Sequence, residues 1–246
     1  MGKGLEGAVL RLMGAKEHEV TVVSHHDLAP ELRRIRFTSE TLLSDLEIAP
    51  TAWIRLWFPA KDGGSKEFQR GYTIVEADPE AGWFHIDFVL HDGLGPAAAW
   101  AEHPMPGDRL TAQIKGTTSF TYADEPGGVV LIGDACALPA INSILAVLPT
   151  DVDVDVLLEH QRELETDFPI ADHPGLTLHR VERQSPETLA HAVEKLNLDN
   201  RQLWASAEVS SLKLVRKLAK QRAGYSKDNT YILAYWSQGR EMGSSR

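Results

Sequence analysis

The sequence contains a single cysteine, Cys136, among its 246 residues. One cysteine excludes an intramolecular disulfide. The N-terminus also lacks the continuous apolar stretch and the cleavage pattern of a secretory signal. Together these two absences favour a cytoplasmic location.

Basic side chains are in the minority, with 25 Lys and Arg against 35 Asp and Glu and a formal net charge of -10. Nucleic acids and anionic membranes select proteins with a net basic face, so this balance argues against either as a partner. The longest apolar runs, such as 128–132, are far shorter than the roughly 20 residues that span a bilayer. We therefore expect a small substrate that is met in solution.

What is present is an ordinary globular composition, with 43% hydrophobic and 24% charged residues. The length suits two domains of about 100–150 residues each. In the first half, short β-rich runs are separated by turn clusters rich in Gly, Pro and Asp, and this even spacing predicts an antiparallel barrel. We expect its strands at residues 19–23, 32–38, 53–58, 71–75, 83–90 and 108–114, with one helix at 95–102.

The second half alternates apolar β-runs with helical patterns, which predicts a doubly wound parallel sheet covered by helices. We expect strands at 128–132, 152–158, 176–181, 202–205 and 230–235, and helices at 138–148, 186–196 and 209–222. The predicted domains are a barrel at residues 1–123 and an α/β domain at residues 127–246. A barrel followed by an open α/β domain suits a flavin in the first and a nicotinamide nucleotide in the second, although a fold does not fix a function.

A more specific signal is the string Arg70-Gly-Tyr-Thr73. An arginine fork can neutralise a pyrophosphate, and Tyr72, two residues later on the same strand face, can lie against an isoalloxazine ring. Thr73 is then positioned to form a hydrogen bond near flavin N5. Taken alone, the string is better explained as part of an ordinary surface strand, so its interpretation depends on its context.

That context is a series of further motifs, and with them the chain resembles the siderophore-interacting protein family. In that family, R-x-Y-T is followed by D-F-V-L-H, G-P-A-x-x-W-A, P-G-D, G-D-E-T-A-L-P-A-I, L-W-x-A-G-E and G-Y-W-x-x-G. The resemblance covers residues 18–240. Its further motifs here are Asp87-Phe-Val-Leu-His91, Gly95-Pro-Ala97, Trp100-Ala101, Pro106-Gly-Asp108, Gly133-Asp134, 137–141, Leu203-Trp204 with Glu208, and Tyr235-Trp236 with Gly239.

The resemblance implies that FAD is held by the barrel. Gly95 and Ala97 leave room for phosphate oxygens at a helix N-terminus, where free N–H groups and the helix dipole favour an anion. The family's G-P-R-G-S-F is replaced here by Lys115-Gly-Thr-Thr-Ser-Phe120, whose hydroxyls still suit the diphosphate or adenosine. Asp87 as a solvated strand residue and His91 as a turn residue are equally open interpretations. The implied cofactor-binding residues are Arg70, Tyr72, Thr73, Asp87, Phe88, Val89, His91, Gly95, Pro96, Ala97, Thr117, Thr118 and Ser119.

The resemblance places the electron donor in the second half. Family positions are changed there, because Ala207 and Ala234 replace glycines and Ala135-Cys136 replaces Glu-Thr. Each change puts a side chain where backbone approaches a dinucleotide, so we expect an obstructed donor site. We interpret Cys136 as a buried residue rather than a reactive thiol. The implied donor-binding residues are Gly133, Asp134, Glu208, Tyr235 and Trp236.

The donor itself stays open between NADH, NADPH and reduced ferredoxin. Glu159-His-Gln-Arg162 follows the second parallel strand, where an adenosine ribose is recognised in this fold class. An acid there suits a 2′-hydroxyl, whereas Arg162 suits a 2′-phosphate.

The activity implied is FAD-dependent reduction of ferric siderophores with release of Fe(II) in the cytoplasm, with no catalytic acid, base or metal site. Lys115, Arg222, Lys227 and Arg240 are candidates to attract an anionic chelate, and ordinary surface charge is the alternative for each. Two other functions stay open: a flavin or siderophore binding protein with a decayed nicotinamide site, and a general flavin-dependent electron transferase.

Overall fold

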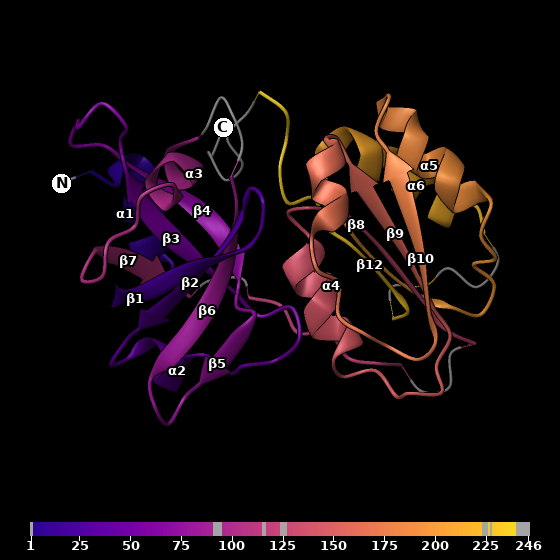
Figure 1. Ribbon diagram of the computed structural model, residues 1–246, viewed down its shortest axis with the longest axis horizontal. Helices are drawn as coiled ribbons and strands as arrows, with labels where there is room; N and C mark the ends of the chain where they lie inside the picture. Colours follow the sequence, from indigo (N-terminus) through magenta and orange to yellow (C-terminus); the bar gives the residue numbers. More distant parts are fainter. Residues whose placement is uncertain are drawn as a thin grey trace. The chain divides into compact units, whose positions relative to one another are not determined.

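The computed structural model describes residues 2–90, 95–114, 117–123, 127–222, 226 and 228–239, apart from the side chains of Glu6 and Arg11. Four of the predicted site residues, His91, Lys115, Lys227 and Arg240, lie outside the described residues. The chain divides into two compact units, the first ending at Phe120 and the second beginning at Thr121. Figure 1 shows the course of the chain through both units.

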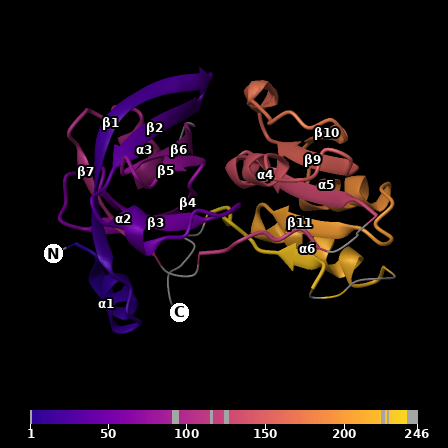
Figure 2. The same ribbon diagram turned by 90° about the horizontal axis from the view of Figure 1, so that it is seen from below.

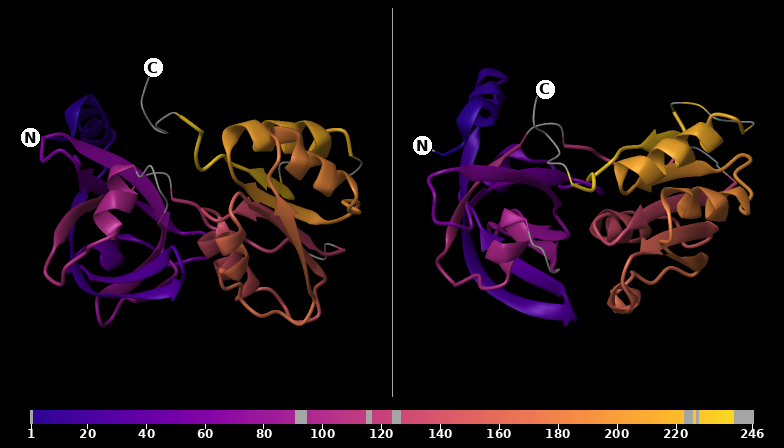
Figure 3. Two further views of the ribbon diagram at one scale, coloured as in Figure 1. Left: turned by 45° about the horizontal axis from the view of Figure 1, so that its top comes forward. Right: turned by 90° about the horizontal axis from the view of Figure 1, so that it is seen from above.

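The first unit is a seven-stranded antiparallel sheet in the order β4-β3-β7-β1-β2-β6-β5, which curls into a barrel (Figures 1 and 3). Its strands are β1 (Glu17–Ala29), β2 (Leu32–Thr38), β3 (Trp53–Pro59), β4 (Glu67–Thr73), β5 (Glu76–Asp78), β6 (Trp83–Val89) and β7 (Arg109–Gln113). Its helices are α1 (Gly4–Leu12), α2 (Leu42–Asp45) and α3 (Pro96–Ala101).

Buried and partly exposed residues alternate along the strands, and this alternation determines which side chains fill the barrel. In β2, Leu32, Ile35 and Phe37 are buried, while the arginines between them are partly exposed. The inward residues of the strands form one core, and Ala97, Trp100 and Ala101 of α3 pack against it. Since β4 ends the strand order, one of its edges has no strand partner among the described residues.

The second unit is a parallel sheet in the order β10-β9-β8-β11-β12. Its strands are β8 (Val129–Asp134), β9 (Val154–His160), β10 (Leu176–Glu182), β11 (Gln202–Ser206) and β12 (Thr230–Ile232), and its helices are α4 (Leu138–Leu145), η1 (Glu163–Asp167), α5 (Pro186–Glu194) and α6 (Val209–Ala219). The chain runs from β8 outward to β10 and then returns to place β11 on the other side of β8. Ligands of such sheets bind at this switch point, beyond the carboxyl ends of the strands.

Helices cover both faces of this sheet. Val130 and Ile132 of β8 share a core with residues of α5 and α6. On the other face α4 approaches β8 closely, because a Cβ on Gly133 would lie 2.7 Å from the Cβ of Ala137 and 2.8 Å from Cδ1 of Ile141. Gly133 therefore serves helix–strand packing, and every residue of β8 is buried.

The predicted fold class, a barrel followed by a doubly wound parallel sheet, is confirmed. Three strand predictions need correction: β1 is Glu17–Ala29 rather than 19–23, β4 is Glu67–Thr73 rather than 71–75, and β12 ends at Ile232 rather than at residue 235. After β4 and β12, neighbouring hydrogen bonds continue past the regular strand, as from Leu233 N to Ala205 O at 3.0 Å. The prediction also lacked α1, α2, β5 and η1, which are elements of three to nine residues.

Candidate functional site

Two of the predicted flavin residues share one face of the edge strand β4. In the antiparallel register of β3 and β4, Arg70 lies opposite Leu56 and Tyr72 lies opposite Ile54. Leu56 and Ile54 belong to the barrel core. Because directly opposed residues project to the same side of a sheet, Arg70 and Tyr72 both project toward the inner face of the barrel at its open edge.

Aromatic neighbours fix the ring of Tyr72. Its centroid lies 4.4 Å from that of Phe88 and 5.9 Å from that of Phe58. The side chain is only half-buried, so part of the ring remains accessible. Arg70 is also half-buried, and its Nη1 donates to the carbonyl of Gln69 at 2.6 Å. An accessible aromatic ring beside a guanidinium suits a flavin and its diphosphate.

The hydroxyl groups of Thr117 and Thr118 form hydrogen bonds around the start of β3. Thr117 Oγ1 accepts from the backbone N–H of Trp53 at 3.1 Å, and Thr118 Oγ1 donates to the carbonyl of Thr51 at 3.1 Å. Trp53 pairs directly with Thr73 in the sheet. Thr73 is buried and projects to the face opposite that of Tyr72, and Ser119 is exposed. The structure thus brings the loop of Thr117 and Thr118 beside the end of β4.

Asp87 forms an ion pair within the wall of the barrel. Arg34, its direct partner across β2 and β6, donates to both of its carboxylate oxygens at 2.7 and 2.8 Å. The hydrogen bonds that Arg34 donates to Asp87 raise the pKa of the guanidinium. The carboxylate is buried, in contrast to the open interpretation of Asp87 as a solvated strand residue. Its neighbour Phe88 faces the core, and Val89 ends β6.

Gly95 and α3 provide open space beside the core. A Cβ built on Gly95 would meet no described atom within 4 Å. Pro96 occupies the first turn of α3, where its missing N–H leaves no donor unsatisfied, and Ala97 is buried beneath the helix. This space fits the close approach of a ligand to backbone, as FAD binding requires.

The predicted donor residues converge at the carboxyl edge of the parallel sheet. Trp236 Nε1 donates to Asp134 Oδ2 at 2.6 Å, and the backbone N–H groups of Cys136 and Ala137 donate to Asp134 Oδ1 at 3.0 and 3.3 Å. Glu208 forms a parallel bridge with Trp236. Asp134 therefore joins the turn before α4 to the C-terminal segment that contains Trp236.

The carboxyl group of Asp134 is buried, with 5% of its surface exposed. Burial raises its pKa to about 7, and the negative charge of Glu159 adds to the rise, while the bonds from Trp236, Cys136 and Ala137 oppose it. A group with this pKa changes its charge near neutral pH.

Arg183 binds several acidic and hydroxyl groups at the same edge, although no motif in the sequence points to it. Its Nη1 donates to Glu159 Oε2 and to Ser211 Oγ at 2.8 Å each, and its Nη2 lies 3.4 Å from Glu208 Oε2. Glu208 also caps α6 by accepting from the backbone N–H of Ser210 at 2.6 Å. Burial acts against ionisation of Glu208, but these bonds still leave its pKa below the ordinary value.

The two residues considered for ribose recognition are both paired internally. Glu159 is 1% exposed and bound to Arg183, and burial raises its pKa. Arg162 donates from Nε and Nη2 to Glu165 Oε1 at 3.1 and 3.0 Å. A dinucleotide that used either residue would have to displace its present partner.

The structure locates three of the substituted positions, and the expectation that Cys136 is buried is wrong. The methyl group of Ala207 lies fully buried in the core between the sheet and α5 and α6, because its strand face is the one these helices cover. Ala234 packs partly buried against the same core. Cys136 is exposed rather than buried, since it lies in the turn before α4 whose backbone Asp134 holds inward.

Of the four candidate substrate cations, Arg222 alone lies within the described residues, and it is not at this edge. Arg222 follows α6, and its Nη2 donates to the carbonyl of Glu194 at 3.3 Å, where α5 ends. Because α6 begins beside Glu208 and runs back along the sheet, Arg222 lies at the amino edge, a full helix away from Trp236.

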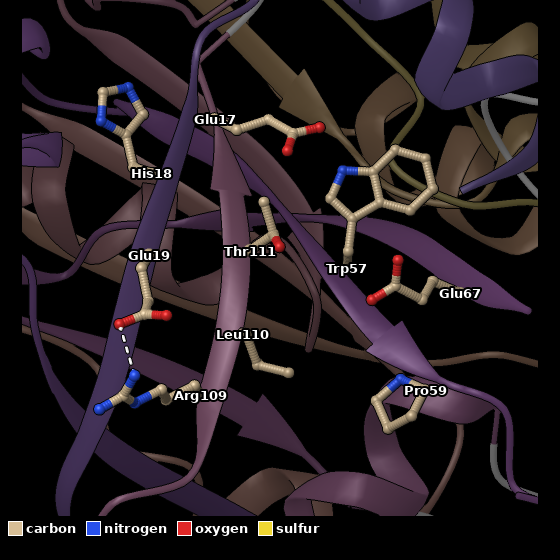
Figure 4. A pocket seen from close by; sticks show the side chains of 9 residues that line it. All are labelled: Glu17, His18, Glu19, Trp57, Pro59, Glu67, Arg109, Leu110 and Thr111. Atoms are coloured by element: carbon tan, nitrogen blue, oxygen red, sulfur yellow. Dashed lines mark ion pairs between the residues drawn. The ribbon is translucent and has the colours of Figure 1, made fainter. Parts of the chain in front are cut away.

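A cavity of about 360 Å³ opens on the barrel beside Trp57 (Figure 4). Its lining includes Glu17, Glu19 and Glu67, and Arg109 pairs with Glu19 at 3.2 Å. None of the predicted flavin residues lines it, and Glu67 lies at the opposite end of β4 from Tyr72. The cavity is thus separate from the candidate flavin site.

Two family models match the chain. Residues 60–114 match the siderophore-interacting FAD-binding domain, and residues 127–239 match the siderophore-interacting protein model. Together the matched residues make up more than half of the chain. Among the described helices, none is long and apolar enough to cross a membrane.

Curated relatives fall into two groups. The mycobactin import ATP-binding/permease protein IrtA of Mycolicibacterium thermoresistibile is 42% identical over 250 residues, which is 100% of this chain and 28% of that protein. The chain thus spans less than a third of the length of the permease proteins it matches. The ferric acinetobactin reductase of Acinetobacter baumannii is 26% identical over 93% of this chain and 81% of that protein.

Solved structures share the fold. A siderophore utilization protein from T. fusca superimposes with a TM-score of 0.80 at 27% identity, covering 92% of this chain and 95% of that chain. A ferredoxin NADP+ reductase from Neisseria gonorrhoeae, with bound FAD and NADP, shares the fold alone, with a TM-score of 0.63 at 15% identity over 90% of this chain and 100% of that chain. The predicted ferredoxin-reductase-like fold is thereby confirmed.

The raised pKa of Asp134 predicts a pH-dependent stability. The folded protein holds this proton more tightly than the unfolded chain, so stability falls as pH rises from about 4 to about 7 and levels off above that. Asp134→Asn removes this fall, and its stability relative to the wild type should rise across that window by at most about 4 kcal/mol. Urea unfolding between pH 5 and 8 measures the difference, with the exposed Asp151→Asn as control. Parallel pH profiles for all three proteins would contradict the assignment.

The burial of Ala207 predicts that replacing it with the family's glycine destabilises the folded protein. Ala207→Gly loses a buried methyl group and gains backbone freedom, which should cost about 1–2 kcal/mol of unfolding free energy. Ala234→Gly, at a partly exposed position, should cost less. Urea unfolding compares the two variants. Unchanged stability of Ala207→Gly, combined with faster flavin reduction by NADPH, would mean that the methyl group obstructs a nucleotide instead.

Proposed function

The chain belongs to the siderophore-interacting protein family, and we propose that it is a flavin-dependent reductase of ferric siderophores. The observation that carries this proposal is the shared face of Arg70 and Tyr72 on β4, inside the segment that matches the FAD-binding family model. The relatives named ferric acinetobactin reductase and ferric vibriobactin reductase give the proposal its substrate class.

In this proposal the barrel holds FAD through residues from several elements. Arg70 neutralises the diphosphate, and the accessible ring of Tyr72 flanks the isoalloxazine. Phe58 and Phe88 keep that ring oriented, so little side-chain freedom is lost when the cofactor binds. Gly95 admits backbone contact, and Thr117, Thr118 and Ser119 offer hydroxyls beside Thr73. Asp87 acts through its ion pair with Arg34, which fixes β6 against β2.

Bound FAD supplies the exchange between a two-electron donor and one-electron acceptors. The chain itself needs no general acid or base for iron release. Hard oxygen ligands hold Fe(III) tightly and Fe(II) weakly, so reduction of the metal is sufficient for release. The protein's tasks are to bind the cofactor, leave its edge accessible and admit the chelate. Iron released in this way serves the cytoplasm, where we place the reaction.

The proposal includes two alternative electron donors, NAD(P)H and reduced ferredoxin. The carboxyl edge offers Asp134, Glu208, Tyr235 and Trp236 to a nicotinamide nucleotide. The buried ion pair between Glu159 and Arg183 favours the protein donor, because ribose recognition by Glu159 would require breaking that pair. Breaking a buried ion pair costs roughly 3–5 kcal/mol. Anaerobic stopped-flow with NADH, NADPH and reduced ferredoxin separates the donors.

The FAD site predicts unequal effects of two substitutions. Arg70→Ala should weaken FAD binding roughly 10- to 100-fold, since a charge-assisted contact to phosphate contributes about 1.5–3 kcal/mol. Tyr72→Phe keeps the ring and loses one hydroxyl, so it should weaken binding by less than about tenfold. Flavin fluorescence titration measures both. Arg55→Ala is the control, because Arg55 stacks on Trp53 at 4.6 Å on the other face of β3. Equal dissociation constants for the Arg70 and Tyr72 variants would contradict these roles.

The reductase activity itself is tested without any natural donor. The FAD-loaded protein is photoreduced under anaerobic conditions and mixed with a ferric hydroxamate chelate and a chromogenic Fe(II) trap. We expect the oxidised flavin spectrum to return together with trapped Fe(II), at least tenfold faster than with free reduced FAD. A protein that binds FAD but reoxidises no faster than free flavin would be a binding protein rather than a reductase.

A further inference from the structure

The segment of residues 209–227 differs in charge from the rest of the chain. It contains six Lys and Arg residues and no Asp or Glu, whereas the whole chain has a formal charge of -10. Most of this segment is the helix α6 (Val209–Ala219). A basic segment in an acidic chain creates a local positive field, which attracts a partner of negative charge.

Basic side chains form one row along α6, which we call the α6 basic stripe. It consists of Lys213, Arg216, Lys217 and Lys220, all of them exposed. Their spacing of i, i+3, i+4 and i+7 places them on one side of the helix. The other side of α6 is buried in the core that it shares with α5 and the parallel sheet. Figure 2 shows α6 at the margin of the second unit.

The stripe has no counterions within the described part of the chain. No carboxylate there pairs with any of its four side chains, and only Arg216 has a side-chain hydrogen bond, from Nη2 to the carbonyl of Ile232 at 2.7 Å. Like charges three and four residues apart are unfavourable on a helix. The helix dipole favours the basic residues of the last turn, but Lys213 lies in the first half of α6. The row of positive charge is therefore available to a partner.

The stripe begins close to the carboxyl edge of the parallel sheet. The helix starts directly after Glu208, and Lys213 follows Glu208 by about 8 Å along the helix axis. Glu208 forms a bridge with Trp236, whose indole donates to Asp134. A protein bound along the stripe would thus also reach the edge where the candidate donor residues converge.

We propose that the α6 basic stripe is the docking surface for a small acidic protein that donates single electrons, of the ferredoxin class. This inference rests on the proposed reductase function and selects one of its two alternative donors. Two reduced partner molecules bind in turn, and each gives one electron to the FAD and leaves oxidised. The FAD takes up protons from solvent to reach its two-electron reduced form.

The size of the stripe suits a transient partner. From Lys213 to Lys220 it extends about 10 Å along the helix. Weak electron-transfer encounters bury less than about 1,200 Å² and depend on complementary charge for their rate of association. At physiological salt, exposed charges more than about 8 Å apart are largely screened, so a small partner responds to the stripe rather than to the net charge of the chain.

An anionic membrane fits the stripe less well. Helices that lie in a membrane interface insert large apolar side chains beside their basic ones. On α6, Leu212, Leu214, Val215 and Leu218 all pack in or against the core of the unit. Among the large apolar residues of this helix only Val209, at its start, is exposed. The stripe therefore offers charge without a face to insert.

The test is anaerobic stopped-flow of the FAD-loaded protein against a reduced, acidic plant-type ferredoxin at low and high salt. The second-order rate constant should fall at least about tenfold between about 20 and about 300 mM salt. Lys213→Gln/Lys217→Gln should lower it at least about fivefold at low salt and have little effect at high salt. The control Lys61→Gln/Lys66→Gln removes the same charge from exposed positions between β3 and β4 and should behave like the wild type.

Calorimetric binding of the oxidised ferredoxin at low salt gives the same comparison without electron transfer. The Lys213/Lys217 variant should bind it at least about fivefold more weakly than the wild type, and the control variant should bind it equally well.

A rate constant that does not depend on salt would overturn the proposal, as would equal losses in the two double variants. A flavin that NADH or NADPH reduces and the ferredoxin does not would also overturn it. Flotation with phosphatidylglycerol vesicles that the Lys213/Lys217 variant loses, with its ferredoxin rate unchanged, would assign the stripe to a membrane instead.

Reoxidation of the photoreduced protein by a ferric hydroxamate chelate uses no donor, so it tests the proposed function separately. A protein that accepts electrons from the ferredoxin with the expected salt dependence, but does not reduce the chelate, would retain the docking surface and lose the proposed substrate.

Discussion

The register between β3 and β4 is the constraint on which the candidate flavin site depends. It places Arg70 opposite Leu56 and Tyr72 opposite Ile54, so both project toward the inner face of the barrel at its open edge. A shift of one residue would turn both side chains to the other face. The register is held by the buried core on one side and by the close fit of Gly71 on the other, where a Cβ would lie 3.2 Å from the ring of Trp53.

In the second unit, polar groups at the carboxyl edge of the parallel sheet form hydrogen bonds with one another. Asp134 accepts from the turn before α4, where a phosphate would otherwise find free N–H groups, and also from Trp236. Arg183 joins Glu159 to the start of α6. Buried polar groups require such partners, so these bonds stabilise the edge. They also mean that any donor binding here competes with internal contacts.

Much of this organisation is readable from the sequence, because periodicity and turn residues report on local structure. The strand at 32–38 and the helix starts at residues 138, 186 and 209 agree with the structure to the residue. The convergence of Asp134, Glu208 and Trp236 also follows from their motifs. The sequence does not report the register between strands or the ion pairs between residues that are far apart in the chain. Arg34 and Asp87 are 53 residues apart, and Arg183 and Glu159 are 24 apart, so neither ion pair was predicted. The burial of Ala207 likewise depends on which face α5 and α6 cover, and a sequence motif does not report that.

We propose a barrel-bound flavin that passes electrons singly to ferric chelates. The most direct measurement is a count of trapped Fe(II) per bound FAD, when fully photoreduced protein is titrated anaerobically with a ferric hydroxamate chelate. We expect two Fe(II) for each FAD reoxidised, because the cofactor stores two electrons and each iron takes one. Reoxidation of the flavin without Fe(II), or protein that retains no FAD after reconstitution with an excess of the cofactor, would contradict it.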